Sequence, residues 1–372
     1  MASRKYLNLS FNYVPNWDYT HAIRELFQNS LDSETKDSNN KMYFEYNKEE
    51  EVLSIGNKNG ILEERSLLLG ASSKRDDAKQ IGQHGEGYKI ATVVLLREGL
   101  GLKIFNQNKK QVWVAKKVKS RSYDEEIPVF DIEHQIFKKG ADLVFEVSGV
   151  TEEMFEKIID SNLHLIERYR GGLGNHYESE DGKVLLDEQF RHKVFVKGLY
   201  VCDNEAIDYG YDFSPELVKL DRDRHLIDSF NIMWNSSRLI ARMMDSDLIR
   251  KCINKNDGKY LDSFVYMLSD KIKNDVAYDF FKEYGSDAVP CNTRDEFNDV
   301  AKSGHNAVLV NDSVATFVKT SDYYKESGIK IEPLSEKLSN WFERLKEEVG
   351  VDEHADIIKE GEDLIKLVSS HL

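Results

Sequence analysis

Three glycines, at positions 82, 85 and 87, lie just before a mostly apolar run at residues 90–96. Because glycine has no Cβ atom, the backbone N–H groups beside it can approach an anion closely. The first turn of a helix offers the same anion unpaired N–H donors and the positive end of the helix dipole. The segment therefore predicts a phosphate-binding loop that opens a buried helix, with an ordinary glycine-rich loop as the alternative.

The order of these glycines excludes two common phosphate-binding loops. Gly-x-x-Gly-x-Gly is the reverse of the dinucleotide-binding pattern, and the preceding residues 73–80 are polar and show no strand pattern. A Walker A loop requires Gly-Lys followed by Ser or Thr, which the segment lacks. We therefore expect neither a Rossmann turn nor a P-loop here.

A second stretch, residues 24–32, supplies a carboxylate, an amide and a second carboxylate on one side of a predicted helix. At roughly 100° per residue, Asn29 lies about 40° from Glu25, and Asp32 lies about 20° to its other side. The apolar residues of the stretch fall on the opposite side, so the helix is amphipathic. The alternative is that this polar stripe is only the solvent-exposed face of a surface helix.

Together the two stretches, Glu-x3-Asn-x2-Asp and Ile-Gly-Gln-x-Gly-x-Gly-Tyr, resemble the ATP site of the GHKL superfamily. That superfamily includes DNA gyrase, the ninety-kilodalton heat-shock chaperones, histidine kinases, MutL and the MORC proteins. The second motif is most similar to the heat-shock chaperone and MORC branch. The resemblance covers residues 15–150, continues weakly to about residue 230, and implies ATP and Mg²⁺ as ligands.

The resemblance implies a role for each matching residue. Glu25 would be the general base that polarises the water attacking the γ-phosphate, Asn29 would bind Mg²⁺, and Asp32 would lie at the base of the adenine or ribose pocket. The loop that closes over the phosphates and its neighbours would contribute Ser73, Lys74, Gly82, Gly85, Glu86, Gly87, Tyr88 and Lys89.

One motif departs from the family pattern. The family has a strand followed by Asp-x-Gly-x-Gly, whereas this chain has Asn57 in place of the aspartate, then Asn59 and Gly60. An asparagine oxygen can still accept a hydrogen bond from the adenine amino group, but a neutral acceptor binds more weakly than a charged one. We expect GTP to compete better than is usual for the family. A plain hairpin turn is the alternative, and the family's later threonine is not evident at residues 140–145.

Composition favours a soluble cytoplasmic protein. The chain has 372 residues, 40% of them hydrophobic, which is enough for two or three domains. Apolar runs stay well short of the roughly 18 residues of a membrane span, and no hydrophobic signal region begins the sequence. Three scattered cysteines and histidines without ligand spacing predict neither a disulfide framework nor a zinc site.

Charge is distributed unevenly along the chain. The formal net charge of −15 argues against a protein that coats nucleic acid, yet the segment 103–121 carries seven basic residues and no acidic one. Two apolar stretches, 102–105 and 112–115, predict that this segment is a hairpin. A solvated hairpin is the simpler interpretation, and a patch for nucleic acid or an acidic partner is the other.

The motifs suggest an α+β protein with three parts. These are a Bergerat-type α/β sandwich for ATP at residues 1–168, a transducer-like α/β domain at 169–280, and a small α/β and helical region at 281–372. The first part should end with a helix near 152–168.

In the second part, we expect a strand or bent hairpin at residues 193–201 and a long helix at 226–253. By analogy with related transducers, Arg224 would reach the γ-phosphate, with Arg222 and Lys219 as substitutes. A salt-bridge ladder at a helix start is the alternative for this segment. The third part should contain an α/β module at 283–321 and amphipathic helices at 334–345 and 354–371.

These expectations describe a slow Mg²⁺-dependent ATPase that works as a nucleotide-driven switch, with a homodimer or an unknown protein as its partner and no membrane. The alternatives are a nucleotide-binding regulatory module without hydrolysis, a protein kinase built on the same site, and a nucleic-acid-associated ATPase.

Overall fold

The computed structural model describes residues 3–67, 87–120, 124–137, 140–218, 229–326, 334–349 and 355–369. The chain divides into two compact units, Met1–Glu205 with Tyr209–Asp228, and Ala206–Asp208 with Ser229–Leu372. The domain limits expected at 168/169 and 280/281 therefore fall inside these units. The first unit continues past residue 168 because a second sheet packs with the first 168 residues.

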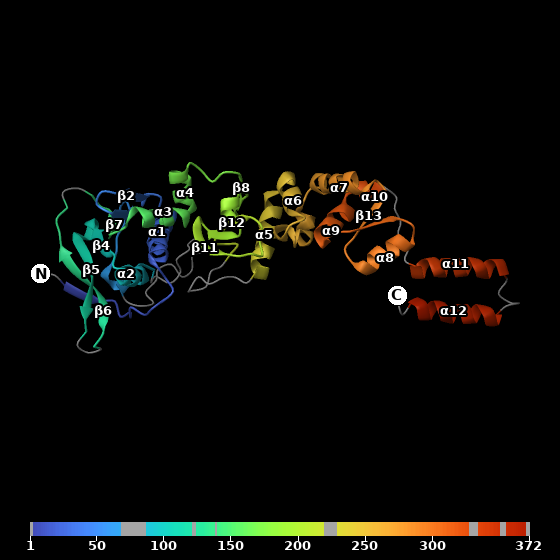
Figure 1. The fold of residues 1–372 in the computed structure, drawn as a ribbon, viewed down its shortest axis with the longest axis horizontal. Helices are drawn as coiled ribbons and strands as arrows, with labels where there is room; N and C mark the ends of the chain where they lie inside the picture. Colours follow the sequence, from blue (N-terminus) through green and yellow to red (C-terminus); the bar gives the residue numbers. More distant parts are fainter. Residues whose placement is uncertain are drawn as a thin grey trace. The chain divides into compact units, whose positions relative to one another are not determined.

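A seven-stranded antiparallel sheet forms the centre of the first unit (Figure 1). Its strand order is β1-β6-β5-β4-β7-β3-β2. The strands are β1 (Ser3–Tyr6), β2 (Met42–Asn47), β3 (Val52–Asn57), β4 (Gly101–Asn106), β5 (Gln111–Lys119), β6 (Glu126–His134) and β7 (Leu143–Ser148).

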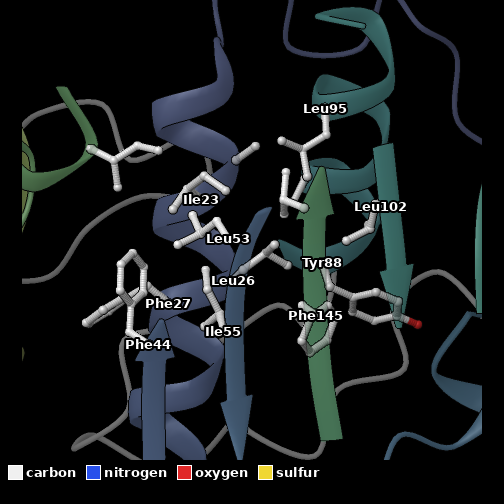
Figure 2. Close-up of a cluster of buried hydrophobic side chains, with 14 of the residues drawn as sticks. Ile23, Leu26, Phe27, Phe44, Leu53, Ile55, Tyr88, Leu95, Leu102 and Phe145 are labelled. Atoms are coloured by element: carbon white, nitrogen blue, oxygen red, sulfur yellow. The ribbon is translucent and has the colours of Figure 1, made fainter. Parts of the chain in front are cut away.

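Helices pack on one face of this sheet, as predicted for an α+β sandwich. They are α1 (Tyr19–Lys36), α2 (Gly87–Arg97), α3 (Glu152–Asp160) and α4 (Leu163–Arg170), with short 3-10 turns at η1 (Glu64–Leu67) and η2 (Gln107–Lys109). Figure 2 shows the buried contact of α1 with strands β2, β3 and β7, made by Ile23, Leu26, Phe27, Phe44, Leu53, Ile55 and Phe145. Side chains alternate across a strand, so the cross-strand pair Lys103 and Glu146 lies on the other face.

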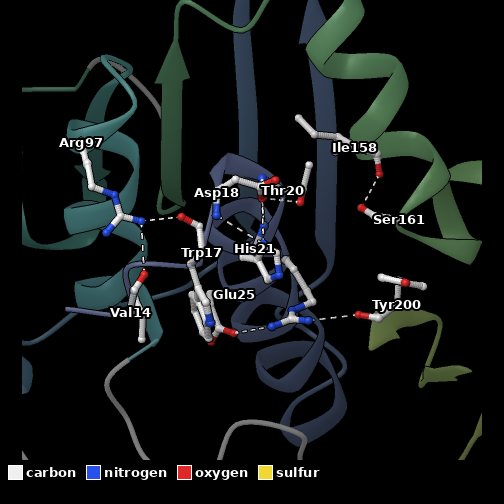
Figure 3. A network of polar contacts seen from close by, with 11 residues as sticks. Val14, Trp17, Asp18, Thr20, His21, Glu25, Arg97, Ile158, Ser161 and Tyr200 are labelled. Carbon is white, nitrogen blue, oxygen red and sulfur yellow. Dashed lines mark hydrogen bonds and ion pairs between the residues drawn. The ribbon is translucent and has the colours of Figure 1, made fainter. Parts of the chain in front are cut away.

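The two central helices are tied together near the start of α1. Asp18 caps α1, since its side chain accepts hydrogen bonds from the N–H groups of Thr20 and His21. The guanidinium of Arg97, the last residue of α2, donates to the backbone carbonyls that precede this cap, those of Phe11, Tyr13, Val14 and Trp17 (Figure 3). The segment entering α1 is therefore held by the end of α2.

Two predicted helices are each divided in the structure. The helix expected at 152–168 is α3 and α4, because Asn162 caps a new helix by accepting from the N–H of His164. The long helix expected at 226–253 is α5 (Ser229–Met243) and α6 (Ser246–Cys252). Met244 has a left-handed backbone with a φ of 51°, and the side chain of Asp245 then caps α6.

The predicted basic hairpin is confirmed as β4 and β5. Several of its lysines lie in ion pairs with nearby acids: Lys109 with Glu63 at 2.7 Å, Lys116 with Asp131 at 3.0 Å, and Lys119 with Asp124 at 2.9 Å. Hydrogen bonds from Arg4 and Lys116 lower the pKa of Asp131 to about 2. Much of the positive charge is thus balanced within the hairpin and its neighbours.

A second, mixed sheet of five strands completes the first unit, in the order β11-β10-β12-β9-β8. Its strands are β8 (His176–Ser179), β9 (Gly182–Leu185), β10 (Lys193–Val196), β11 (Leu199–Asp203) and β12 (Gly210–Phe213), with a 3-10 turn η3 at Glu188–Phe190. Strands β10 and β11 form the hairpin predicted at 193–201, and β10 pairs in parallel with β12.

The second unit is mainly helical around a small parallel sheet. Strands β13 (Ala288–Cys291) and β14 (Asn306–Leu309) are joined by α8 (Arg294–Lys302), which confirms the α/β module predicted at 283–321. The other helices are α5, α6, η4 (Asn256–Gly258), η5 (Leu261–Met267), α7 (Asp270–Tyr284), α9 (Asp312–Thr320), α10 (Asp322–Glu326), α11 (Leu334–Val349) and α12 (Ala355–Ser369). Within the described ranges, no helix combines the length and apolar character needed to cross a bilayer.

A buried acid in the five-stranded sheet predicts a pH-dependent stability. Burial raises the pKa of Asp212 to about 6, while its Oδ1 accepts a hydrogen bond from the N–H of Gly198 at 2.7 Å. Because folding raises this pKa, the group stabilises the fold most below pH 4, and that contribution is lost as the pH rises to 6. Urea unfolding should show Asp212→Asn gaining on the order of 3 kcal/mol over the wild type between pH 4 and pH 7. Equal slopes for Asp212→Asn and wild type would refute the prediction.

Candidate functional site

The two sequence motifs meet where α2 begins. A Cβ atom built on Gly87, the first residue of α2, would lie 2.6 Å from Oε2 of Glu25 and 3.1 Å from Nδ2 of Asn29. Real Cβ atoms do not come that close to a neighbouring atom, so any other residue at position 87 would displace the Glu25 carboxylate. The Glu25 carboxylate and the Asn29 amide of α1 thus face Gly87, the last glycine of the motif.

Both carboxylates of the polar stripe of α1 are buried. Glu25 is 2% exposed and Asp32 is fully buried, whereas Asn29 between them is partly exposed, so the stripe is not a solvent-facing surface. The guanidinium of Arg24 lies 3.8 Å from Oε1 of Glu25 and donates to the carbonyl oxygen of Tyr200 in β11 at 3.1 Å (Figure 3). It also lies over the ring of Trp17, 5.6 Å from the ring centroid. Arg24 therefore connects α1 to β11 of the second sheet, next to Glu25.

Asn57, at the end of β3, has its amide group fixed by backbone carbonyls. Its Nδ2 donates to the carbonyl oxygen of Ser30 at 2.8 Å and to that of Asn40 at 2.9 Å. Both amide hydrogens are therefore used, which leaves Oδ1 to accept a hydrogen bond. In the following turn, Asn59 has the left-handed backbone expected of an asparagine there, with a φ of 55°.

Two asparagines, one at the end of β4 and one in the following 3-10 turn, hold the turn that contains Gly60, and the sequence alone did not reveal them. Nδ2 of Asn108 donates to the Gly60 carbonyl at 3.2 Å, and Nδ2 of Asn106 donates to the Leu62 carbonyl at 2.6 Å. Leu143 of β7 is paired with Asn57 on one side and with Asn106 on the other, so all three side chains share one sheet face. Asn106 is fully buried, and its Oδ1 accepts no hydrogen bond from the residues described. The only sequence signal was the turn-forming character of Asn-x-Asn.

Of the remaining predicted site residues, the structure describes two. Tyr88 is buried, which raises the pKa of its phenol, and its Oη lies 2.7 Å from Oγ of Ser66. Lys89 is fully buried on α2. The others, Ser73, Lys74, Gly82, Gly85, Glu86 and Arg224, lie outside the described residues.

The side chains of the site are better suited to a hard cation that is held mainly by a triphosphate than to a metal ion held by the protein alone. Within the described part of the chain, no group of three or more His, Cys, Asp or Glu could bind a metal ion. Magnesium is usually held by one or two protein oxygens together with phosphates and water. Asn29 beside the glycine at a helix start fits that pattern.

We predict that Asn57→Asp destabilises the protein, although aspartate stands at this position in the superfamily whose motifs the chain resembles. A carboxylate cannot donate, so it would face the carbonyls of Ser30 and Asn40 with two hydrogen bonds lost in a buried position. The expected loss is about 2–4 kcal/mol in the free energy of unfolding, measured with urea. Asn59→Asp, at an exposed position in the same turn, should cost far less. Equal losses for the two variants would contradict this explanation.

The comparisons with known proteins find similarity only among solved structures. No protein-family model matches the sequence, and no curated protein matches it. The ATPase region of Saccharomyces cerevisiae topoisomerase II bound to ICRF-187 is 14% identical with a TM-score of 0.32, over 49% of this chain and 62% of that chain. A second structure of that region gives 14%, 0.30, 49% and 62%, and the ATPase and transducer domains of Balamuthia mandrillaris topoisomerase II give 12%, 0.30, 49% and 60%.

The chain thus spans less than two thirds of the solved chains that it matches. None of these three is a heat-shock chaperone or a MORC protein, so that branch stays a prediction. With TM-scores of 0.30–0.32, the likeness carries no argument about function, which rests on the contacts described above.

Proposed function

We propose that the chain is a GHKL-type ATP-binding protein that hydrolyses ATP slowly with Mg²⁺ and changes conformation with nucleotide state. The observation that carries this proposal is the approach of Gly87 to Glu25 and Asn29. A Cβ atom built on Gly87 would lie 2.6 Å from Oε2 of Glu25 and 3.1 Å from Nδ2 of Asn29. A helix start without a side chain supports anion binding, because its N–H groups and dipole favour phosphate.

Each described residue has a role in the proposal. Mg²⁺, when bound, would neutralise charge on the phosphates, and Asn29 is the residue that would hold it. Glu25 would take a proton from a water molecule as the water oxygen bonds to the γ-phosphorus and the bond to the bridging oxygen breaks, which yields ADP and phosphate. Arg24 would keep the buried Glu25 carboxylate oriented, since it is anchored on β11.

The hydrogen bonds of Asn57 support adenine over guanine. The amide hydrogens are bound to Ser30 and Asn40, so only Oδ1 is left to meet a base. Adenine offers an amino donor to such an acceptor, whereas guanine offers another acceptor at the same place. These hydrogen bonds of Asn57 therefore favour ATP. The sequence, which does not show the partners of Asn57, had led us to expect that GTP would compete.

Contacts of α1 with the second sheet support the proposed switch. Arg24 donates to Tyr200 of β11, and Lys197 donates to Oγ1 of Thr35 at 2.6 Å. A shift of α1 on nucleotide binding would therefore be transmitted to the five-stranded sheet through these two hydrogen bonds. A homodimer, an unknown protein partner and a cytoplasmic location remain part of the proposal.

One observation favours a binding module without hydrolysis as the second candidate. A guanidinium 3.8 Å from Oε1 of Glu25 competes for the oxygen that would receive a proton. The nucleic-acid-associated alternative has less support, because Lys109, Lys116 and Lys119 are paired with acids.

Glu25→Gln separates hydrolysis from binding. The amide keeps the shape of the side chain but is not a base, so phosphate release should fall by about 10²–10⁴-fold while ATP affinity changes little. Phosphate release and calorimetry measure the two quantities. Glu34→Gln makes the same change on the same helix and should leave both unchanged.

A second variant tests the geometry independently. Gly87→Ala would place a methyl group against the Glu25 carboxylate and should reduce turnover as well. Wild-type turnover in Glu25→Gln would remove Glu25 from the mechanism. ATP binding without measurable turnover in the wild type would support the second candidate.

Asn29→Ala tests the proposed magnesium ligand. Because the amide oxygen is the protein's contribution to the metal, Mg²⁺ should no longer strengthen ATP binding by more than about threefold in this variant. Calorimetry with and without Mg²⁺ gives the ratio for variant and wild type. An Asn29→Ala protein with the wild-type magnesium dependence would exclude Asn29 as the ligand.

A further inference from the structure

A two-residue turn between β10 and β11 carries a lysine in an unusual backbone conformation. Lys197 has a φ of 51° and Gly198 a φ of 79°, so both central residues of the hairpin turn are left-handed. Glycine is required at the second position, since a Cβ there would lie 2.7 Å from the ring of His164. Lysine at the first position is not favoured by the turn itself, where asparagine, aspartate or glycine is usual. Its side chain must therefore explain it.

The turn is fastened to its surroundings by backbone groups. The N–H of Gly198 donates to Asp212 at 2.7 Å, and the N–H of Lys197 donates to the carbonyl of Phe213 at 3.0 Å, both in β12. On the other side, the carbonyl of Gly198 accepts from the N–H of Leu163 at the start of α4, at 2.8 Å. The Cα of Lys197 is thus fixed relative to the first unit.

From this fixed point the side chain of Lys197 reaches α1. Its Nζ donates to Oγ1 of Thr35 at 2.6 Å and lies 3.8 Å from Oδ1 of Asp32. Lys197 is 25% exposed, whereas Asp32 is completely buried. Burying a carboxylate is costly unless a cation or hydrogen-bond donors lie near it. The ammonium of Lys197 is such a cation, brought from a different sheet.

We propose that Lys197 is a positioning residue for nucleotide binding, which pairs with the buried Asp32 carboxylate from the turn of the second sheet. This inference rests on the proposed function, in which Asp32 lies at the base of the adenine or ribose pocket. It adds a residue outside both sequence motifs, and it makes the five-stranded sheet part of the nucleotide site.

The test is a set of full-length variants titrated with Mg-ATP by calorimetry. Lys197→Met keeps the length of the side chain and places the same demand on the left-handed backbone, but it removes the charge. It should raise the Kd for Mg-ATP about tenfold. Lys197→Arg should recover most of the affinity. Lys183→Met is the matched control, because Lys183 is similarly shielded in the same sheet but pairs with Glu178 inside that sheet.

A double-mutant cycle with Asp32→Asn supplies the readout that a merely structural role would not move. If Lys197 acts through Asp32, Lys197→Met should weaken binding little further in the Asp32→Asn background, so the two effects are not additive. Equal Kd values for Lys197→Met, Lys183→Met and wild type would overturn the inference, as would fully additive effects in the cycle.

Two further results separate the possible failures. A wild-type protein that does not bind Mg-ATP refutes the proposed function and this inference with it, whereas binding by the wild type with no effect at Lys197 refutes only the inference. If Lys197→Met does not fold, Thr35→Val removes the other partner of the ammonium and Lys197→Arg keeps its charge. Lower affinity in the first with near-normal affinity in the second supports the proposal, and unchanged affinity in Thr35→Val together with lost affinity in Lys197→Arg contradicts it.

Discussion

The polar side of α1 meets the start of α2 at a position that carries no side chain, Gly87. A Cβ atom there would lie 2.6 Å from Oε2 of Glu25, so another residue would push the carboxylate aside. That approach leaves Glu25 and Asn29 facing the start of α2 while Ile23, Leu26 and Phe27 cover the sheet. The glycine therefore decides how near the Glu25 carboxylate and the Asn29 amide come to the start of α2.

Local patterns allowed much of the first unit to be predicted from sequence. The helical spacing of Leu26, Phe27 and their neighbours predicted α1, the apolar run predicted α2, and the two apolar stretches at 102–105 and 112–115 predicted the β4–β5 hairpin. The divided helices were missed because each break depends on one or two residues. Asn162 and Asp245 are weak signals in a sequence, yet each caps a new helix and so ends the preceding one.

The parts of the site that could not be predicted are those made by residues far apart in the chain. Asn57 was recognised as a departure from a family pattern, but its two acceptors, Ser30 and Asn40, fix the direction of its amide. The contact of Arg24 with Tyr200 joins residues 176 positions apart, and that of Lys197 with Thr35 joins residues 162 positions apart. Neither Arg24 nor Lys197 belongs to a motif. Periodicity and spacing describe one element at a time, whereas these contacts depend on how two sheets pack.

Arg97 fixes one end of the pair formed by α1 and α2. Its guanidinium donates to four carbonyls in the segment that enters α1, those of Phe11, Tyr13, Val14 and Trp17. Separating the helices at Arg97 would break all four of these hydrogen bonds at once, which costs more than the loss of a single one. The path of the chain into α1 therefore depends on one side chain of α2.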